Sequence, residues 1–243
     1  MTTQPNLLSQ IIIILVETET PGNLGASARA LKSMGLKSLR LVNPNRLNSR
    51  EAVARAVGAQ DILQDAQVFT SLLAAIQDCI LVIGTTGKIE NLDQPRYTPK
   101  EIPTILANHQ TSDPIALVFG RESKGLSREE LSLCNAHIRI PTHPQCPSLN
   151  LAAAVQIVCY ELFMATNIFV STHSSTAKLA SHEQLNYLLK QLETLAIEVK
   201  VLDPDQPRQM VRRLRELYSR NVPRKAELDL MIQICKRVLQ RLS

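Results

Sequence analysis

A strand, a short glycine-bounded loop and a capped helix follow one another near the middle of the chain. Residues 115–119 are an apolar run typical of a buried strand. Residues 120–126 begin with Gly120 and contain Gly125, and Ser127 with Glu130 forms a capping box that predicts the start of a helix. In open α/β sheets, ligands bind where such loops meet at the carboxyl ends of strands. The chain is therefore expected to form a sheet whose strand-end loops build a binding site.

Apolar runs and helical segments alternate along the first two thirds of the chain. Strands are predicted at residues 11–16, 38–42, 79–83, 115–119 and 137–140. Helices are predicted at 23–34 with Asn23 as the cap, at 49–57, at 71–78 and, as the longest, at 149–169 with Ser148 as the cap. Residues 91–103 are rich in proline and polar residues and predict a surface loop. The alternation predicts an α/β fold with a mostly parallel sheet and helices on both faces.

The end of the chain differs from the body. Residues 1–169 are predicted to form the α/β domain, 170–180 a polar linker, and 181–243 an all-helical extension. Three helices are predicted in the extension, at 182–200, 206–220 and 224–242. The middle helix has an apolar stripe made of Met210, Val211, Leu214, Leu217 and Tyr218. Its basic residues Arg208, Arg212 and Arg215 are predicted to share another face.

Positive charge is concentrated at the end of the chain. The net charge is +5, and from residue 200 onward there are 11 Lys and Arg against 5 Asp and Glu, which leaves 16 against 17 elsewhere. A basic tail suits a polyanionic partner, and a solvated helical face is the alternative. Aromatic residues make up 3% and Trp is absent, which argues against binding of single strands by base stacking.

Cysteine usage and hydropathy bear on the compartment. Five cysteines show no paired spacing and no targeting segment is evident, which favours a reducing compartment such as the cytoplasm. The apolar segment 151–170 is interrupted by Gln156, Glu161 and Asn167. These polar residues argue against a membrane span.

Two further strand-end loops resemble the central one. They are residues 84–87, with the sequence Gly-Thr-Thr-Gly, and residues 141–150. We interpret the three loops together as one small-molecule pocket. A glycine turn also opens the small-residue helix near residue 22, but it lacks the Gly-x-Gly-x-x-Gly pattern and the acidic residue of a dinucleotide site. Arg29 in this helix is either a surface arginine or a clamp for a phosphate or alkoxide.

Simpler explanations compete with some of these features. Arg121 and Glu122 could pair with each other on the surface, and Ser148 could be only a helix cap. Four residues could suggest a zinc site, namely Cys134, His137, His143 and Cys146. The two histidines stand at opposite ends of a predicted strand, too far apart to share a metal, so no metal is expected. His109 and His182 lie in polar sequence without a nucleophile motif, which disfavours a hydrolase triad.

Three motifs in this order resemble those of the SPOUT RNA methyltransferases, and within them the TrmH-like 2′-O-ribose methyltransferases. The first is Asn-Leu-Gly-Ala-x-Ala-Arg-Ala at 23–30, the second Phe-Gly-Arg-Glu-x-x-Gly-Leu at 119–126. The third is Ile-Pro at 140–141 with Ser-Leu-Asn-Leu-Ala at 148–152. The basic tail is similar to the extension of the subgroup that methylates the ribose of cytidine or uridine at position 32 of the tRNA anticodon loop. The family usually has Ala-Arg in place of Gly87-Lys88 and often Tyr-Ser in place of Cys146-Pro147.

The resemblance implies a C-terminal trefoil knot, S-adenosylmethionine as methyl donor, a homodimer and tRNA as partner. The implied catalytic residues are Arg29, Asn23, Ser148 and Asn150. The implied cofactor-binding residues are Thr85, Thr86, Gly87, Gly120, Glu122, Ile140, Pro147, Ser148 and Leu149. The implied RNA-binding residues are Lys88, Arg208, Arg212, Arg213 and Arg215. A ribosomal RNA methyltransferase of the same fold and a non-catalytic RNA-binding or assembly protein remain as alternatives.

Overall fold

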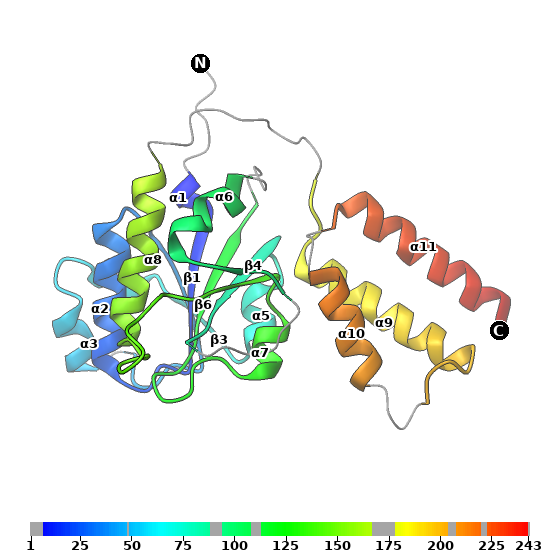
Figure 1. Cartoon of the computed structure of the whole chain (residues 1–243), viewed down its shortest axis with the longest axis horizontal. Coiled ribbons are helices and arrows are strands. Elements are labelled where there is room, and N and C mark those ends of the chain that lie inside the picture. The colour runs from blue at the N-terminus through cyan, green and yellow to red at the C-terminus, as the bar shows by residue number, and fades with distance from the viewer. Residues whose placement is uncertain are drawn as a thin grey trace, which may run out of the picture.

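The computed structural model of the chain describes residues 7–47, 49–87, 94–107, 113–166, 178–203, 208–219 and 223–242. Figure 1 shows an α/β body and a separate group of helices at the C-terminal end. The body begins with the short helix α1 (Leu7–Gln10) and ends with α8 (Leu151–Ala165). The helical group consists of α9 (His182–Glu198), α10 (Arg208–Ser219) and α11 (Lys225–Leu242). All described residues after 166 therefore belong to this group or to its connections.

The sheet has seven strands in the order β3-β2-β1-β6-β4-β7-β5, and every strand pairing is parallel. The strands are β1 (Ile11–Val16), β2 (Ser38–Val42), β3 (Gln67–Phe69), β4 (Leu81–Thr85), β5 (Arg96–Tyr97), β6 (Ile115–Phe119) and β7 (Ala136–Ile138). Since all strands run the same way, the loops after β4, β6 and β7 leave the same edge of the sheet. The predicted parallel sheet is confirmed.

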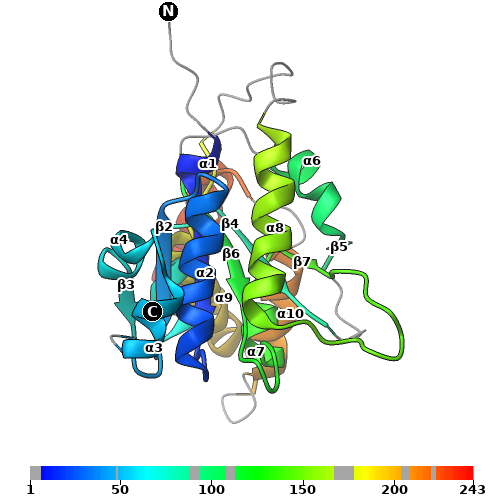
Figure 2. The same cartoon turned by 90° about the vertical axis from the view of Figure 1, so that its left-hand side faces the viewer.

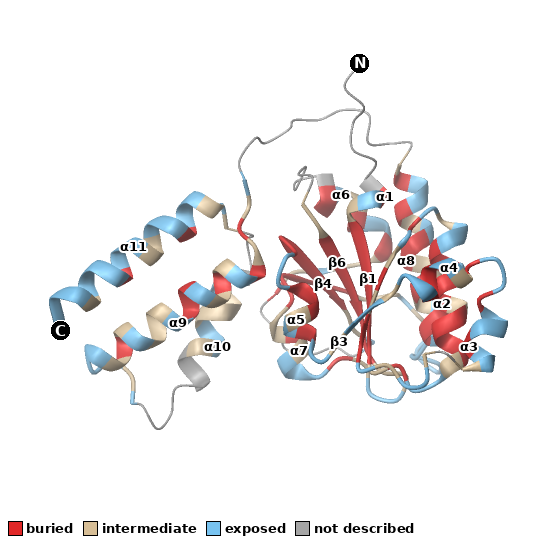
Figure 3. Ribbon diagram, turned by 180° about the vertical axis from the view of Figure 1, so that it is seen from behind, coloured by how far each residue is buried: buried red, intermediate tan, exposed pale blue. Residues whose placement is uncertain are grey.

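Helices cover both faces of the sheet. Alternate residues of β1 point to opposite faces, so that Ile11 and Ile13 join one core and Ile12 and Ile14 the other. On the first face, α2 (Pro21–Ser33) and α8 lie side by side, as Figure 2 shows. The opposite core receives α5 (Leu72–Ile76) and α7 (Arg128–Ser132). Figure 3 shows the resulting burial of the central strands.

Two predicted helix caps are wrong. Asn23 lies inside α2, whose N-cap is Thr20. The cap of α8 is Asn150, whose side chain accepts hydrogen bonds from the backbone N–H groups of Ala152 and Ala153. Ser148 therefore stays outside the helix. The helix is also not the longest, because it has 15 residues against 17 in α9 and 18 in α11. The predicted end at residue 169 lies outside the described residues.

Several short elements escaped the sequence prediction. The expected loop at 91–103 contains β5, a 3-10 turn at Pro99–Glu101 and the start of α6 (Ile102–Ala107). Strand β3 and helix α4 (Gln60–Gln64) follow the short helix α3 (Arg50–Arg55). The predicted cap Ser127 is confirmed. Ser49 and Ser71, the first residues of two predicted helices, are caps as well, because each serine side chain accepts a backbone N–H of the next turn.

The helical extension has its own small core. Leu185, Leu188 and Leu189 of α9 pack with Leu228 and Cys235 of α11. The three predicted helices are confirmed, and Leu214 and Tyr218 of α10 pack against this core. Leu217 is 58% exposed, so its place in the predicted apolar stripe is wrong. The side chain of Met210 lies outside the described residues.

The start of α9 joins the extension to the body. The backbone N–H groups of His182 and Glu183 donate to the carbonyl oxygens of Cys79 and Gln77. The His182 side chain is 3% exposed, with its Nε2 3.2 Å from Oδ1 of Asn135. His182 is therefore a buried residue with a polar partner at the junction, while His109 lies outside the described residues. Of the predicted linker, residues 170–177 also lie outside them.

Candidate functional site

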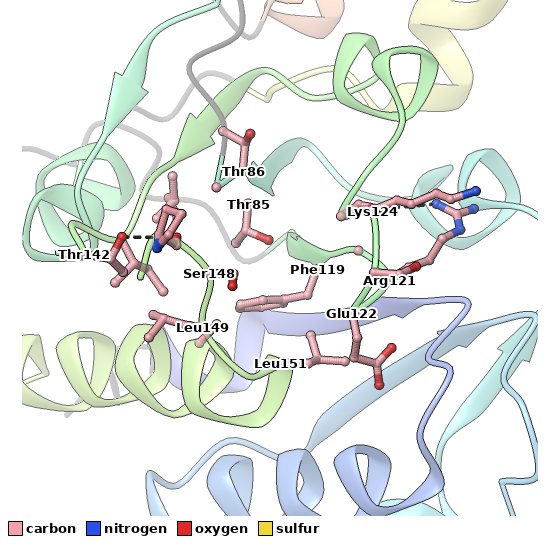
Figure 4. A pocket seen from close by; sticks show the side chains of 18 residues that line it. Thr85, Thr86, Phe119, Arg121, Glu122, Lys124, Thr142, Ser148, Leu149 and Leu151 are labelled. Carbon is pink, nitrogen blue, oxygen red and sulfur yellow. Dashed lines mark hydrogen bonds between the residues drawn. The ribbon is translucent and has the colours of Figure 1, made fainter. Parts of the chain in front are cut away.

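A cavity of about 280 Å³ opens where the loops after β4, β6 and β7 meet at the carboxyl edge of the sheet. In Figure 4 the labelled side chains of Thr85, Phe119 and Ser148 come from these different segments and face one space. Nine residues predicted to bind the cofactor line it, namely Thr85, Thr86, Gly87, Gly120, Glu122, Ile140, Pro147, Ser148 and Leu149. The structure thus brings together positions as far apart in sequence as Thr85 and Leu149, although their role as ligand contacts stays a prediction.

Other residues of the cavity were not predicted. Phe119 ends β6, Leu151 and Ala154 begin α8, and Ile138 ends β7. Phe119 and Leu151 belong to the second and third motifs, and Ile138 and Ala154 lie two residues from the third, so proximity to the motifs was the available signal. They contribute an apolar floor on the face of the sheet that α8 covers. Such a floor with a few polar groups at its rim is typical of small-molecule sites.

Of the three glycines that line the cavity, Gly120 and Gly87 differ in what a side chain would meet. A Cβ on Gly120 would collide with the backbone of Gly125 and of Leu126. The backbone therefore passes itself too closely for any side chain at this position. A Cβ on Gly87 would meet nothing within 4 Å. The turn therefore requires glycine at position 120, whereas position 87 has free space where a side chain would stand.

A chain of hydrogen bonds connects the first, second and third motifs. Nδ2 of Asn150 donates to Oδ1 of Asn23 at 2.9 Å, and Nδ2 of Asn23 donates to Oε1 of Glu122 at 2.7 Å. The Glu122 carboxylate also accepts the backbone N–H groups of Glu19 and Thr20. Burial opposes ionisation of Glu122, but these donors outweigh it, and the pKa of the carboxyl lies below its ordinary value. Glu122 thus holds the second-motif loop to the start of α2.

Arg121 is turned away from Glu122. Its guanidinium donates to Glu17 at 2.8 Å and to both carboxylate oxygens of Glu130 at 2.9 and 3.0 Å. These hydrogen bonds raise the pKa of Arg121 and lower that of Glu17. The alternative of a surface pair between Arg121 and Glu122 is therefore wrong, and Arg121 closes the glycine-bounded loop onto α7.

The four predicted catalytic residues do not form one cluster. Ser148 lines the cavity, and Asn23 and Asn150 stand beside it through their hydrogen bonds to each other and to Glu122. Arg29 is exposed on α2 and is not among the residues that line the cavity. A single copy of the described chain therefore brings three of the four to the site.

The predicted RNA-binding residues fall into different settings. Arg213 is exposed, and Arg212, with its side chain 45% exposed, lies 3.5 Å from Glu216. Arg215 instead donates to Oδ1 of Asn186 on α9 at 2.7 Å, and burial lowers its pKa. The expectation that Arg215 shares an outward face with Arg212 is wrong, because α10 turns it toward α9. Lys88 and the side chain of Arg208 lie outside the described residues.

The four residues weighed as a zinc site have separate environments. Burial raises the pKa of the Cys134 thiol, and Nε2 of His137 lies 3.1 Å from the carbonyl oxygen of Leu131. Cys146 and His143 are exposed on the loop after β7. Among the residues that the structure describes, no three His, Cys, Asp or Glu side chains are grouped to hold a metal. In the same part of the chain, no helix has the length and apolar character needed to cross a membrane.

Comparisons with known proteins agree with this geometry. The model of the SpoU rRNA Methylase family matches residues 10–160, and that of the tRNA methyltransferase TrmJ C-terminal domain matches 183–243. A protein of Pseudomonas aeruginosa named tRNA (cytidine/uridine/adenosine-2′-O-)-methyltransferase TrmJ is 40% identical over 93% of this chain and 92% of its own. A Salmonella choleraesuis protein named tRNA (cytidine/uridine-2′-O-)-methyltransferase TrmJ is 36% identical over 97% and 98%.

A solved structure resembles the whole fold. The crystal structure of TrmJ from Z. mobilis ZM4 has a TM-score of 0.81 and 28% identity, and the match covers 93% of this chain and 98% of that chain. The matched length includes both the α/β body and the helical extension. Since the family model covers more than half of the chain and full-length relatives are 36–40% identical, the chain belongs to the SpoU methylase family and to its TrmJ branch.

Proposed function

We propose that this chain transfers a methyl group from S-adenosylmethionine to the ribose 2′-hydroxyl of cytidine or uridine in tRNA, at position 32 of the anticodon loop. The observation that carries the proposal is the cavity in which three motif loops meet, lined by all nine positions expected to contact the donor. The names of the TrmJ relatives support the choice of tRNA and of the ribose oxygen.

The residues of the cavity fit the donor. S-adenosylmethionine carries a flat purine, a ribose diol and a charged amino-acid end. Phe119, Ile138 and Leu149 offer apolar surface for the purine, and open space beside Gly87 leaves room for the ligand. Thr86 and Ser148 provide hydroxyls, and the loop amides around Gly120 provide donors and acceptors. The arrangement is that of a site for one medium-sized polar molecule.

The proposed chemistry needs positioning more than acid or base strength. When bound, the donor supplies a methyl group on a positively charged sulfur. The loops must hold the acceptor oxygen in line with it, and held geometry of this kind can supply roughly 7–11 kcal/mol of the barrier. Asn23 and Asn150 connect the first and third motifs by a hydrogen bond. Ser148, which lines the cavity, would hydrogen-bond the ribose hydroxyl. Arginine stays protonated, so Arg29 would grip a phosphate and stabilise the forming alkoxide.

A homodimer would explain the position of Arg29. This side chain is exposed on α2 and does not line the cavity of its own chain. The neighbouring helix α8 exposes Tyr160 (47%), Phe163 (42%) and Met164 (46%). An exposed apolar face of this kind fits a dimer interface. Across that interface, the exposed Arg29 would reach the cavity of the partner subunit. We include the trefoil knot in the proposal, because the loop at 141–150 returns the chain to α8 on the same face as α2.

The extension would hold tRNA. It carries the excess of basic residues, and its family model is that of a tRNA methyltransferase. We keep 1–169, 170–180 and 181–243 as the proposed division into methyltransferase domain, linker and RNA-binding extension. The cytoplasm is the proposed compartment. The name of the SpoU family model refers to rRNA, which keeps ribosomal RNA as a second candidate substrate.

A methyl-transfer assay tests the proposal. Unmodified tRNA transcripts and ribosomal RNA are each incubated with the full chain and labelled S-adenosylmethionine, and the modified nucleoside is mapped by mass spectrometry. We expect label on a pyrimidine 2′-oxygen of tRNA. Arg29→Ala should keep donor binding in calorimetry yet lose transfer. Label on ribosomal RNA alone would mean that ribosomal RNA, not tRNA, is the substrate. A wild-type chain that neither binds S-adenosylmethionine nor transfers its methyl group would favour a non-catalytic RNA-binding protein.

A further inference from the structure

A second cavity, of about 370 Å³, lies next to the first. Arg96 of β5 and Arg139, just after β7, both line it. Thr142 lines both cavities, and its hydroxyl donates to the carbonyl oxygen of Pro147 at 3.1 Å. Thr142 therefore belongs to the wall of both cavities, so a polymer that leaves the first cavity past this residue reaches the second.

The sheet register places the two arginines on one face. Arg96 is the register partner of His137, and Arg139 follows His137 by two positions, so all three side chains leave the same side of the sheet. The ladder continues beyond the strand, because the backbone N–H of Arg139 donates to the carbonyl oxygen of Tyr97 at 2.8 Å. The regular strand pairing thus fixes the backbone positions of both arginines.

Their charges are not neutralised within the described part of the chain. None of the ion pairs found there includes Arg96 or Arg139. The carboxylate among the residues that line this cavity, that of Glu101, accepts the backbone N–H and the hydroxyl of Thr98 at 2.7 and 2.8 Å. Two guanidinium groups on one wall, without an acidic partner, suit an anion with several oxygens.

We propose that this second cavity binds a phosphodiester of the RNA strand whose target ribose occupies the first cavity. The inference rests on the proposed function, and it adds Arg96 and Arg139 as positioning residues for the substrate. Their forked donors would hold one backbone phosphate next to the modified nucleotide, which fixes the register of the strand over the methyl donor. Since phosphates carry no base identity, this contact would position the strand and leave base preference to other residues.

The test compares two full-length double variants that lose the same charge. One is Arg96→Gln with Arg139→Gln, and the control is Arg50→Gln with Arg55→Gln, whose arginines are exposed on α3. Binding of an unmodified tRNA transcript is measured as a function of salt, and S-adenosylmethionine binding by calorimetry. We expect the cavity variant to bind tRNA about tenfold more weakly, because each phosphate contact is charge-assisted. Its salt slope should fall by about 0.7, the value for one lost phosphate contact with a single strand.

The remaining readouts separate the explanations. The cavity variant should raise KM for tRNA with little change in donor affinity and in melting temperature, since neither guanidinium forms an ion pair with the described residues. Equal tRNA binding and salt slope in the cavity and control variants would overturn the proposal. So would a cavity variant that loses binding of inorganic phosphate or cytidine monophosphate while tRNA binding stays unchanged, because the site would then serve a small free anion.

Failure of the proposed function has a different signature. A wild-type chain that binds tRNA but transfers no methyl group contradicts the assigned activity, while a weakened cavity variant would still support the phosphate site. A wild-type chain that methylates tRNA together with a fully binding cavity variant overturns the phosphate site alone.

Discussion

Asn150 and Asn23 lie 127 residues apart in sequence, yet Nδ2 of Asn150 donates a 2.9 Å hydrogen bond to Oδ1 of Asn23. Asn23 in turn donates to Glu122, so one side chain connects the loop after β6 with the loop before α8. Asn150 uses its other atom, Oδ1, to cap α8. The shape of the candidate donor cavity therefore depends on a small polar network at the end of the sheet.

This network should be measurable as coupling between the two asparagines. Asn23→Ala removes partners from both Asn150 and Glu122, and we expect it to lower the free energy of unfolding by about 1–3 kcal/mol. In a double-mutant cycle with Asn150→Ala, the interaction energy from urea denaturation should be about 0.5–1.5 kcal/mol. Asn45→Ala is the control, because its side chain donates only to the carbonyl oxygen of Glu19 on the surface. Strictly additive effects of Asn23 and Asn150 would show that the hydrogen bond carries no net stability.

The two cavity glycines should respond differently to alanine. Gly120→Ala places a Cβ against the backbone of Gly125 and Leu126, which cannot move aside as a flexible side chain could. We expect a loss of about 1–3 kcal/mol or more in unfolding free energy and loss of donor binding. Gly87→Ala meets nothing within 4 Å and should keep the melting temperature. Calorimetric unfolding of both proteins decides, and equal stability of the two variants would contradict the backbone collision.

The free energy of unfolding should fall at acid pH, partly because of His182. Burial, with a contribution from Arg215, lowers the pKa of His182 from 6.5 to about 4. Between these values the unfolded chain binds a proton that the folded chain does not, so stability from this group is complete above pH 6.5 and is lost as pH falls toward 4. The loss should amount to at most about 3 kcal/mol.

The His182 effect is tested by urea unfolding across that pH range. His182→Gln removes the titration and should flatten the profile, whereas His143→Gln, at an exposed position, should leave it unchanged. A wild-type profile that is already flat between pH 6.5 and 4 would mean that His182 takes up a proton in the folded state.

Arg213 and Arg215 should separate RNA binding from stability. Arg215 is half-buried and donates to Asn186 of α9, so Arg215→Ala should lower the melting temperature of the extension. Arg213 is exposed, so Arg213→Ala should keep the melting temperature while tRNA affinity falls and the salt slope drops by about 0.9. Differential scanning calorimetry and salt-dependent tRNA binding give the two readouts. If Arg215→Ala weakened tRNA binding and Arg213→Ala lowered the melting temperature, Arg215 and not Arg213 would be the residue that contacts the RNA.

Strand positions in the centre of the sheet were predictable because burial on both faces leaves an uninterrupted apolar run. The bounds of β1, β2 and β6 match the prediction to the residue. Strands β3 and β5 were missed for the opposite reason. They are two or three residues long, and Val68 and Arg96 are exposed, so neither alternation nor an apolar run marks them.

The positions of the cavity residues were predictable through the family resemblance, but several side-chain roles were not. Ser148 and Asn150 are both suitable caps for α8, and only the contact with Asn23 distant in sequence favours Asn150. Helical spacing placed Arg215 beside Arg212, but the packing of α10 against α9 decides which arginine meets solvent. Tertiary contacts of this kind leave no local signal in sequence.

The central claim is that the loops after β4, β6 and β7 together form the methyl-donor site. A crystal of the full chain grown with S-adenosylhomocysteine tests it most directly. The account predicts density for the ligand between Thr86, Gly120 and Leu149, with the Asn23–Glu122 hydrogen bond intact. Ligand bound elsewhere on the chain, with this cavity filled by water or collapsed, would contradict it.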